Sequence, residues 1–222
     1  MNFGDATGSA LRAGFRPLPS GIRGYRVQRC PRCWMERTAC ICDLLPRLAT
    51  RTRVLIVMPW KESARSSNTG RLAHLALLNS EVRLRGHPAQ PLDLGDLAAA
   101  AGRGLVLFPG PAARPLEPLQ PEDAPPLLVV PDGTWRQARR VVKHERALAG
   151  FRRVQLPPGP PSRYRLRKPR RPGWLCTYEA LARALDLLEG GGIEQALLPA
   201  FEAMVERTLR HRGRCGGPQP RG

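Results

Sequence analysis

The sequence predicts an α/β fold, with a mostly parallel sheet covered by helices on both faces, plus a small N-terminal zinc-binding module. Two observations predict the sheet. Short aliphatic runs alternate with helical patterns along the chain, and three of the four runs are apolar at nearly every position. Such runs are typical of parallel strands that are buried on both faces. The chain has 222 residues, which is enough for one domain with a sizeable buried core.

The aliphatic runs are expected to form four strands, and a proline follows each of them. They lie at residues 53–58, 104–108, 127–130 and 153–156. Helices are expected between and after these strands. Their ranges are 67–79, with Ser66 or Ser67 as the N-cap, then 134–146, 177–188 and 193–210.

Composition sets the outer boundaries of the fold. Residues 1–28 are rich in Gly, Arg and Pro without periodicity, so we expect a flexible arm there and a flexible tail over 212–222. No stretch approaches the roughly 18–20 apolar residues of a membrane-spanning helix. Residues 1–29 also lack the apolar run of a secretory signal. We therefore expect a cytoplasmic protein without a membrane partner, as either a monomer or a homodimer.

Four cysteines crowd into the predicted module, residues 29–46. The pattern is Cys30-Pro-Arg-Cys33, six residues, then Cys40-Ile-Cys42. Four thiolates brought together by two turns suit a tetrahedral zinc ion, and a site filled by four cysteines has no open position for catalysis. The alternative is four reduced thiols in an exposed loop, which would oxidise easily. We expect structural zinc.

The net charge is +18, and a polyanion is the partner it favours. Residues 134–171 hold thirteen Arg or Lys and one acid. Cations on a proline-stiffened loop can follow a phosphate backbone, and Tyr164 or Trp174 can stack on a base. The alternative is a solvated surface in an arginine-rich proteome. The RNA-binding candidates in this region are Arg136, Arg139, Arg163, Tyr164, Arg165, Arg167 and Lys168.

Polar residues follow two of the predicted strands. Asp132-Gly133-Thr134-Trp135 comes after the strand at 127–130, where ligands bind in parallel sheets. The alternative is that Asp132 caps the next helix and Trp135 packs in the core. The stretch 61–70, after the first strand, suits a polar or anionic group, or else caps a helix among solvated charges. Cys176 is expected to be a small buried thiol rather than a nucleophile.

Together these motifs resemble those of DTW-domain proteins. Asp132-Gly133-Thr134-Trp135 is similar to the D-x-T-W signature of that family. The likeness holds in order and spacing from about residue 29 to 190. It takes in the four cysteines, Arg65–Gly70, Phe108-Pro109-Gly110, Tyr164–Pro169 and Cys176-Thr177-Tyr178-Glu179-Ala180. One departure is Cys176, where the family pattern has a small hydroxyl residue.

The resemblance implies a fold and an activity. The fold is SPOUT-like, with a C-terminal knot, over a catalytic domain at 50–211. The activity is transfer of the 3-amino-3-carboxypropyl group of S-adenosylmethionine to N3 of a uridine in tRNA, leaving 5′-methylthioadenosine. Two alternatives stay open: a SPOUT-type RNA methyltransferase, and a zinc-bearing RNA-binding protein that is not an enzyme.

The resemblance also implies roles for individual residues. Asp132 and Trp135 are the catalytic candidates, with Asp132 as a general base or as the anchor of the methionine ammonium. Arg65, Ser67 and Asn68 join the RNA-binding candidates, and Ser67, Asn68 and Thr69 can face either the amino-acid end of the cofactor or the RNA. The cofactor-binding candidates are Pro109, Gly110, Val130, Asp132, Gly133, Thr134, Leu156, Cys176 and Thr177.

Overall fold

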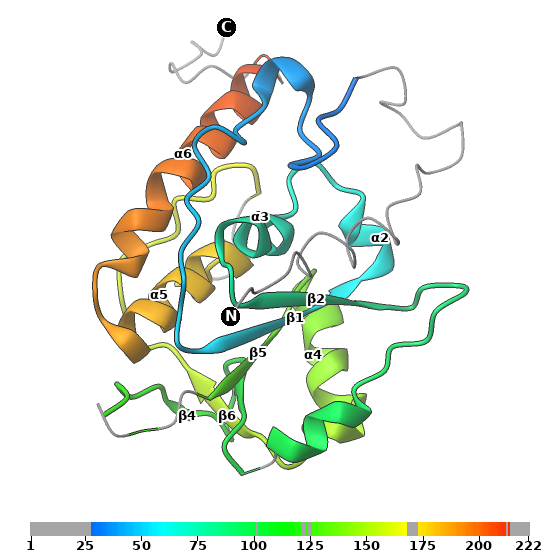
Figure 1. Cartoon of the computed structure of the whole chain (residues 1–222), viewed down its shortest axis with the longest axis vertical. Helices are drawn as coiled ribbons and strands as arrows, with labels where there is room; N and C mark the ends of the chain where they lie inside the picture. The colour runs from blue at the N-terminus through cyan, green and yellow to red at the C-terminus, as the bar shows by residue number, and fades with distance from the viewer. Residues whose placement is uncertain are drawn as a thin grey trace, which may run out of the picture.

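The computed structural model describes residues 28–211 and 213, with gaps at 101, 121–122, 124–125, 168–172 and 212. The expected arm and tail lie almost wholly outside the described residues, as does Lys168. Six strands form one sheet in the order β2-β1-β5-β3-β6-β4, and every neighbouring pair is parallel (Figure 1). The strands are β1 (Arg53–Pro59), β2 (Ser80–Arg85), β3 (Leu105–Leu107), β4 (Arg114–Pro115), β5 (Leu127–Pro131) and β6 (Arg152–Gln155).

The helices connect the strands and complete the C-terminal half. They are α2 (Trp60–Ser63), α3 (Thr69–Ala76), α4 (Trp135–His144), α5 (Thr177–Glu189) and α6 (Ile193–His211). Three short 3-10 helices are η1 (Arg37–Ala39), η2 (Gly95–Ala100) and η3 (Arg146–Leu148). Among the described helices, none combines the length and the apolar character that crossing a bilayer requires.

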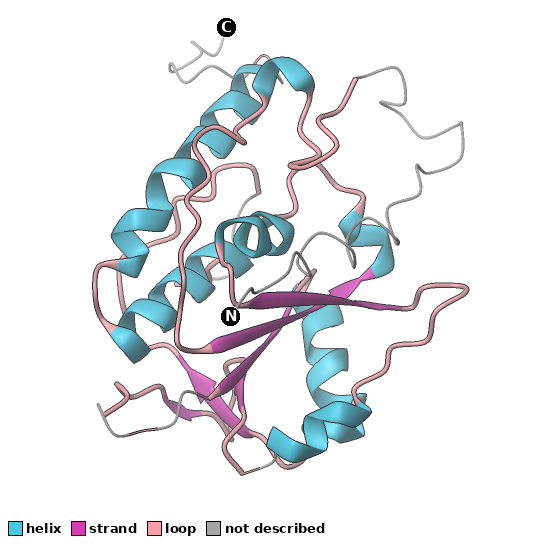
Figure 2. Ribbon diagram, in the orientation of Figure 1, coloured by secondary structure: helices cyan, strands magenta, loops and turns pink. Residues whose placement is uncertain are grey.

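The sheet is covered on both faces, as the sequence predicts. Side chains at successive positions of β1 point to opposite faces, so Ile56 packs in one apolar cluster and Leu55 in another. The first cluster holds the buried faces of α3, α5 and α6. The second holds Val141 of α4 with residues of η2 and η3. Figure 2 shows the same layering, with α3, α5 and α6 away from α4.

Two strands and one helix boundary differ from the sequence prediction. β2 was not expected because its residues, Ser80–Arg85, alternate polar and apolar and are all only half-buried at the sheet edge. β4 is a two-residue edge strand in a proline-rich segment. The helix expected at 67–79 begins at Thr69, because Asn68 rather than a serine caps it. It ends at Ala76, and β2 follows soon afterwards.

The cysteine module (residues 29–46) packs against the end of α6. Thr38 hydrogen-bonds His211 at 2.9 Å, and Arg207 donates to the carbonyl of Cys40. Figure 1 shows η1 beside the C-terminal end of α6. The first and last described segments therefore meet on one side of the sheet.

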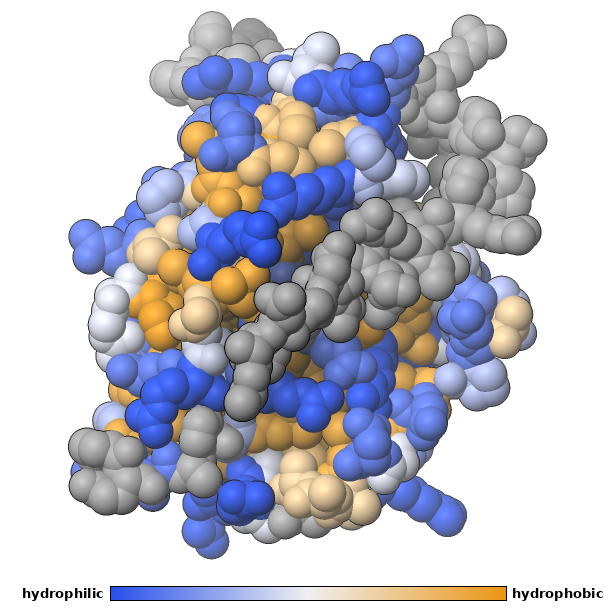
Figure 3. Space-filling model, in the orientation of Figure 1, coloured by the Kyte–Doolittle hydropathy of each residue, from blue (hydrophilic) through white to orange (hydrophobic). Residues whose placement is uncertain are grey.

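On the face seen in Figure 3, hydrophilic side chains are spread widely, and hydrophobic ones show between them in small groups.

Candidate active site

A cavity of about 600 Å³ opens where the carboxyl ends of β3, β5 and β6 meet the segment before α5. This is the edge of a parallel sheet at which ligands bind. The residues that line it come from several separate segments of the chain. They include Glu62, Ser67–Thr69, Leu107–Pro109, Val130–Trp135, Gln155–Gly159 and Trp174–Thr177.

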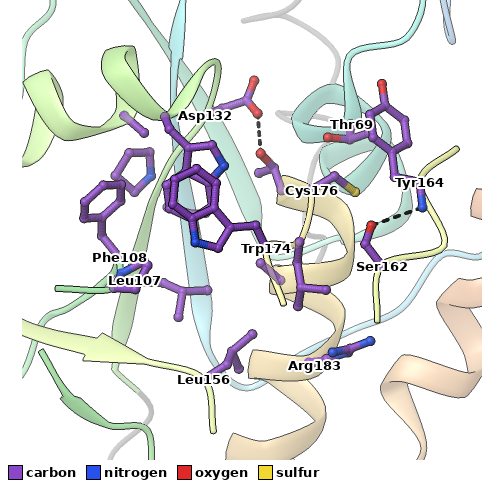
Figure 4. Close-up of a pocket in the computed structure, with 18 of the residues that line it drawn as sticks. Thr69, Leu107, Phe108, Asp132, Leu156, Ser162, Tyr164, Trp174, Cys176 and Arg183 are labelled. Carbon is purple, nitrogen blue, oxygen red and sulfur yellow. Dashed lines mark hydrogen bonds between the residues drawn. The ribbon is translucent and has the colours of Figure 1, made fainter. Parts of the chain in front are cut away.

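Asp132 lies at the centre of this site, directly after β5. Its backbone N–H donates to the carbonyl of Val57 at 2.9 Å, so the sheet pairing continues up to this residue. The side chain is 3% exposed. One carboxylate oxygen accepts from Asn68 Nδ2 at 2.7 Å, and the other accepts from Thr177 Oγ1 at 2.5 Å. Figure 4 shows Asp132 at the cavity with a hydrogen bond to its carboxylate. Asp132 is thus held from two sides in one orientation.

The alternative that Asp132 caps α4 is wrong. Thr134 is the N-cap: its hydroxyl accepts from the Gln137 N–H, and the Gln137 side chain accepts from the Thr134 N–H. Gly133 makes the turn between Asp132 and this cap possible. Its φ is +104°, and a Cβ there would lie 3.0 Å from Pro59. The carboxylate is therefore left free to face the cavity.

Aromatic rings form one wall of the cavity. The rings of Trp135 and Trp174 are 3.9 Å apart between centroids and tilted by 35°, and Phe108 lies 5.7 Å from Trp135. Trp135 therefore stands in the cavity wall, where the sequence places it.

Burial, with help from the nearby Glu179 carboxylate, raises the pKa of the Cys176 thiol well above its ordinary value. A thiol that stays protonated is a poor nucleophile, in keeping with the expected inert role.

The buried carboxylate of Glu179 fixes the loop at residues 162–167, which lines the other side of the cavity. Glu179 accepts hydrogen bonds from Ser162 Oγ at 2.7 Å, from the Arg163 N–H at 2.6 Å and from the Cys176 N–H at 3.1 Å. The Tyr164 hydroxyl donates to the carbonyl of Ser67 at 2.8 Å. The loop is therefore tied to both α5 and the segment before α3.

The three loop arginines in the described residues all face carboxylates. Arg163 pairs with Glu202 and Arg165 with Glu206, both on α6. Arg167 lies 3.6 Å from the buried Glu62, which also pairs with Arg65 at 3.1 Å. By contrast, Arg136 and Arg139 are exposed on α4.

The structure brings most of the predicted site residues to the cavity. Those that line it are Ser67, Asn68, Pro109, Val130, Asp132, Gly133, Thr134, Trp135, Leu156, Tyr164, Arg167, Cys176 and Thr177. Gly110, Arg65, Arg136, Arg139, Arg163 and Arg165 are outside the lining. The sequence analysis included Glu62 and Gly70 in the polar stretch 61–70 but gave neither an individual role, and it gave none to Glu179. The signal for Glu62 was its place just after β1, at the same sheet edge as Asp132.

The four cysteines of the module lie together and can hold a metal ion. Their Sγ atoms are all within 4.8 Å of one another. Cys30 and Cys42 are 3.6 Å apart, and Cys33 and Cys40 are 3.7 Å apart. Four sulfurs at about 2.3 Å from a tetrahedral zinc ion would be about 3.8 Å from each other. The spacing therefore fits this donor set.

The four thiols differ in how readily they ionise without a metal ion. Burial opposes ionisation of Cys30, but hydrogen bonds from the backbone of Cys33 and Arg32 lower its pKa to about 7. Burial raises the pKa of Cys33 and of Cys42. The thiols do not all ionise on their own, and a bound metal ion would supply the missing stabilisation.

Comparison with known proteins identifies the family to which this chain is similar. The model of the DTW domain matches residues 27–209. tRNA-uridine aminocarboxypropyltransferase A of Arabidopsis thaliana is 30% identical, over 82% of this chain and 81% of that protein. tRNA-uridine aminocarboxypropyltransferase 2 is 27% identical in Macaca fascicularis and 28% in Mus musculus, over 84% of this chain in both cases.

This chain spans 65% of the length of the two mammalian relatives. No solved structure matches it significantly. The domain match nevertheless runs from the cysteine module through α6, and it includes every segment that lines the cavity. The chain therefore belongs to the DTW domain family.

Proposed function

We propose that this protein transfers the 3-amino-3-carboxypropyl group of S-adenosylmethionine to N3 of a uridine in tRNA and releases 5′-methylthioadenosine. The activities for which the relatives are named support this proposal. The main structural support is Asp132, a buried carboxylate that two hydrogen bonds hold at the carboxyl end of β5. In the same proposal the protein works in the cytoplasm, with tRNA as its macromolecular substrate.

The cavity suits the two ends of this cofactor. Its volume of about 600 Å³ lies within the usual range for sites of small molecules. Phe108 and Trp135 offer an apolar wall for the adenosine, with Val130 and Leu156 also in the lining. Asp132 offers a carboxylate for the ammonium of the methionine part. When bound, S-adenosylmethionine supplies an electrophilic carbon next to a sulfonium.

The residues of the chain must do three things for this reaction. They remove the N3 proton of the uridine, because the neutral nitrogen is a poor nucleophile. They hold N3 in line with the carbon–sulfur bond, so that the new N–C bond forms as the C–S pair leaves with sulfur. They also keep the methyl carbon of S-adenosylmethionine away from the uridine N3, so that the methyl group is not transferred. Trp135 and Trp174, as a packed pair, can hold a flat ring against one wall of the site.

Asp132 can take either of two roles in this scheme. As a general base it accepts the N3 proton; as an anchor it binds the ammonium group. Asn68 and Thr177 fix the carboxylate in both cases. Substitution of Asp132 by Asn keeps the size of the side chain but removes its charge, and it separates the two roles.

Asp132→Asn should abolish aminocarboxypropyl transfer, measured by mass spectrometry of tRNA after incubation with S-adenosylmethionine. Calorimetry then assigns the role. An anchor predicts at least tenfold weaker cofactor binding, since a charge-assisted hydrogen bond is lost. A base predicts unchanged cofactor binding. Binding of tRNA should survive, because one carboxylate adds little to a surface of net charge +18. Transfer at the wild-type rate would remove Asp132 from the mechanism.

The same mass spectrum tests the two other functions. A SPOUT-type methyltransferase would add a methyl group to the tRNA instead of the larger group. An RNA-binding protein without enzyme activity would leave the tRNA unchanged and would not bind S-adenosylmethionine. Asp132 argues against that last function, because a buried carboxylate does not help to bind phosphates.

The cysteine module is proposed to hold one structural zinc ion on Cys30, Cys33, Cys40 and Cys42. The sulfur spacing supports it, and with four thiolates no position stays open for substrate. Natively purified protein should contain one zinc per chain, measured by elemental analysis. Cys33→Ser should lower thermal stability and yield without a selective effect on turnover. A stable, metal-free and fully active variant would contradict a structural role.

A SPOUT-like arrangement with a C-terminal knot completes the proposal. It is supported by the parallel sheet and by the contact of Thr177, at the start of α5, with Asp132 at the end of β5. A crystal structure with bound cofactor would test it by tracing whether the C-terminal segment passes through a loop of the chain.

A further inference from the structure

Four cations form a stripe along α4. Arg136, Arg139, Arg140 and Lys143 are all exposed, whereas Ala138 and Val141 are buried. With 3.6 residues per turn, the four fall within about 100° of one side of the helix, and the first and last lie about 10 Å apart along its axis. We call these four residues the α4 stripe.

The α4 stripe carries uncompensated charge. Within the part of the chain that the structure describes, none of its four residues makes an ion pair or a side-chain hydrogen bond. Glu145 is the acid nearest in sequence, and it already accepts from Arg85 at 2.6 Å. Several long cationic side chains on one surface, without acidic partners, favour the binding of a polyanion.

The loop arginines differ in this respect. Arg163 and Arg165 each pair with a glutamate of α6. Exposed ion pairs are weak and can be broken. However, Glu202 and Glu206 stay beside any phosphate that replaces them, and they repel it. These two arginines are therefore poorer phosphate contacts than an equal number from the α4 stripe.

The α4 stripe also begins at the candidate active site. Thr134 caps α4, and Trp135 and Ala138 from the first turns of the helix line the cavity. Arg136, in the same first turn, is exposed to solvent. A nucleic-acid strand lying along this side of α4 would thus reach the cavity mouth at the N-terminal end of the helix.

We propose that the α4 stripe is the principal phosphate-binding surface for tRNA, and that Arg163 and Arg165 contribute little to tRNA binding. The proposal rests on the proposed function for the choice of RNA. The contacts are with the sugar–phosphate backbone, so they fix the position of the tRNA rather than read its sequence.

Two matched double variants test this assignment. Arg139→Gln/Arg140→Gln removes two charges from the α4 stripe, away from the cavity lining. Arg163→Gln/Arg165→Gln removes two paired charges from the loop. Binding of unmodified tRNA transcript is measured by fluorescence anisotropy over a range of salt concentrations. Each phosphate contact contributes about 0.7–0.9 to the slope of log affinity against log salt.

The stripe variant should bind more weakly than wild type and lose about 1.4–1.8 from the salt slope, while the loop variant should lose less than half of that. An unchanged slope in the stripe variant, an equal or larger loss in the loop variant, or no tRNA binding by wild type would overturn the assignment. So would stripe-dependent binding of polyglutamate with no effect on tRNA, which would indicate an acidic protein as the partner.

Cofactor calorimetry and tRNA mass spectrometry on the same samples separate this inference from the proposed function. The stripe variant should bind S-adenosylmethionine as wild type does, because neither Arg139 nor Arg140 lines the cavity. Wild-type protein that binds tRNA through the α4 stripe but leaves it unmodified would refute the proposed function and keep the docking surface.

Discussion

At the scale of single residues, the space around Asp132 is as restrictive as its hydrogen bonds. Gly70, in the first turn of α3, lies against the carboxylate. A Cβ on Gly70 would be 2.8 Å from Asp132 Cγ and 3.0 Å from one of its oxygens. Asn68 and Thr177 hold that carboxylate, so it cannot move aside without losing a hydrogen bond. The absence of a side chain at Gly70 therefore leaves the space that the Asp132 carboxylate occupies.

Gly70→Ala should reduce transfer at least tenfold, because the added methyl group displaces the Asp132 carboxylate. Thermal stability should fall by only a few degrees, since alanine is otherwise favourable inside a helix. Gly110→Ala is the control: a Cβ there meets no atom within 4 Å, and Gly110 does not line the cavity. Equal activities of the two variants, measured by tRNA mass spectrometry, would show that the carboxylate has room to move.

At the scale of elements, α3 joins the cysteine module to the candidate active site. Its N-cap, Asn68, accepts from the Arg71 N–H and donates to Asp132. Arg71 is 2% exposed and donates to the carbonyls of Ser63, Cys33 and Arg65. Burial lowers the pKa of Arg71 to about 10, so it is still charged at neutral pH. A metal centre of four thiolates would supply a compensating negative charge near it.

Arg71→Met should lower the free energy of unfolding by about 3 kcal/mol or more, because three carbonyls lose their donor in the interior. Urea denaturation measures this loss. Arg53→Met is the control, since its pair with Glu81 is half-exposed and contributes about 0–1 kcal/mol. If both variants unfold at the same urea concentration, Arg71 does not connect the two regions.

The sequence predicted elements best where local signals decide them. The buried strands, such as β1 and β5, follow from continuous aliphatic runs, because residues facing either side of the sheet are apolar. β2 does not, because its residues are half-buried at the sheet edge and carry three charges. The cap of α3 was misplaced for a related reason. Three polar residues compete there, and the partner that selects Asn68 is Asp132, 64 residues away.

The same limit applies to the site. Asp132 and Trp135 were found because they sit in a short motif after a recognisable strand. Glu179 is buried because Ser162 and Arg163, which are distant in sequence, donate hydrogen bonds to it. A local sequence pattern cannot predict such a contact. The pairing of Arg163 and Arg165 with α6 is equally non-local. Because the sequence does not show these ion pairs, the prediction that the loop arginines contact RNA rested on their density of positive charge alone.

At the scale of the whole molecule, the last turns of α6 complete the cysteine module. Arg207 donates to the Cys40 carbonyl and lies 3.9 Å from Asp43. His211 contacts both Glu36, at 2.9 Å, and Thr38. Leu209 is buried in the same apolar cluster as Cys33 and Ile41. The buried residues Met35, Ile41 and Leu45 of the module belong to the same apolar cluster as α6, so the module depends on this helix for much of its packing.

A chain that ends after Glu206 should therefore lose stability and hold its metal less firmly. Burial of Leu209 and the polar contacts are together worth about 2–3 kcal/mol, which lowers Tm by about 5–10 °C for a domain of this size. Calorimetry gives Tm, and a zinc-sensitive dye follows metal release to a chelator, which should be faster than in the full chain. A chain that ends after Gly213 keeps all of α6 and every contact named above, so it should match the full chain in both measurements. If the shorter chain kept its Tm and released zinc no faster, the cysteine module would be stable without the end of α6, and its four metal ligands would suffice to fold it.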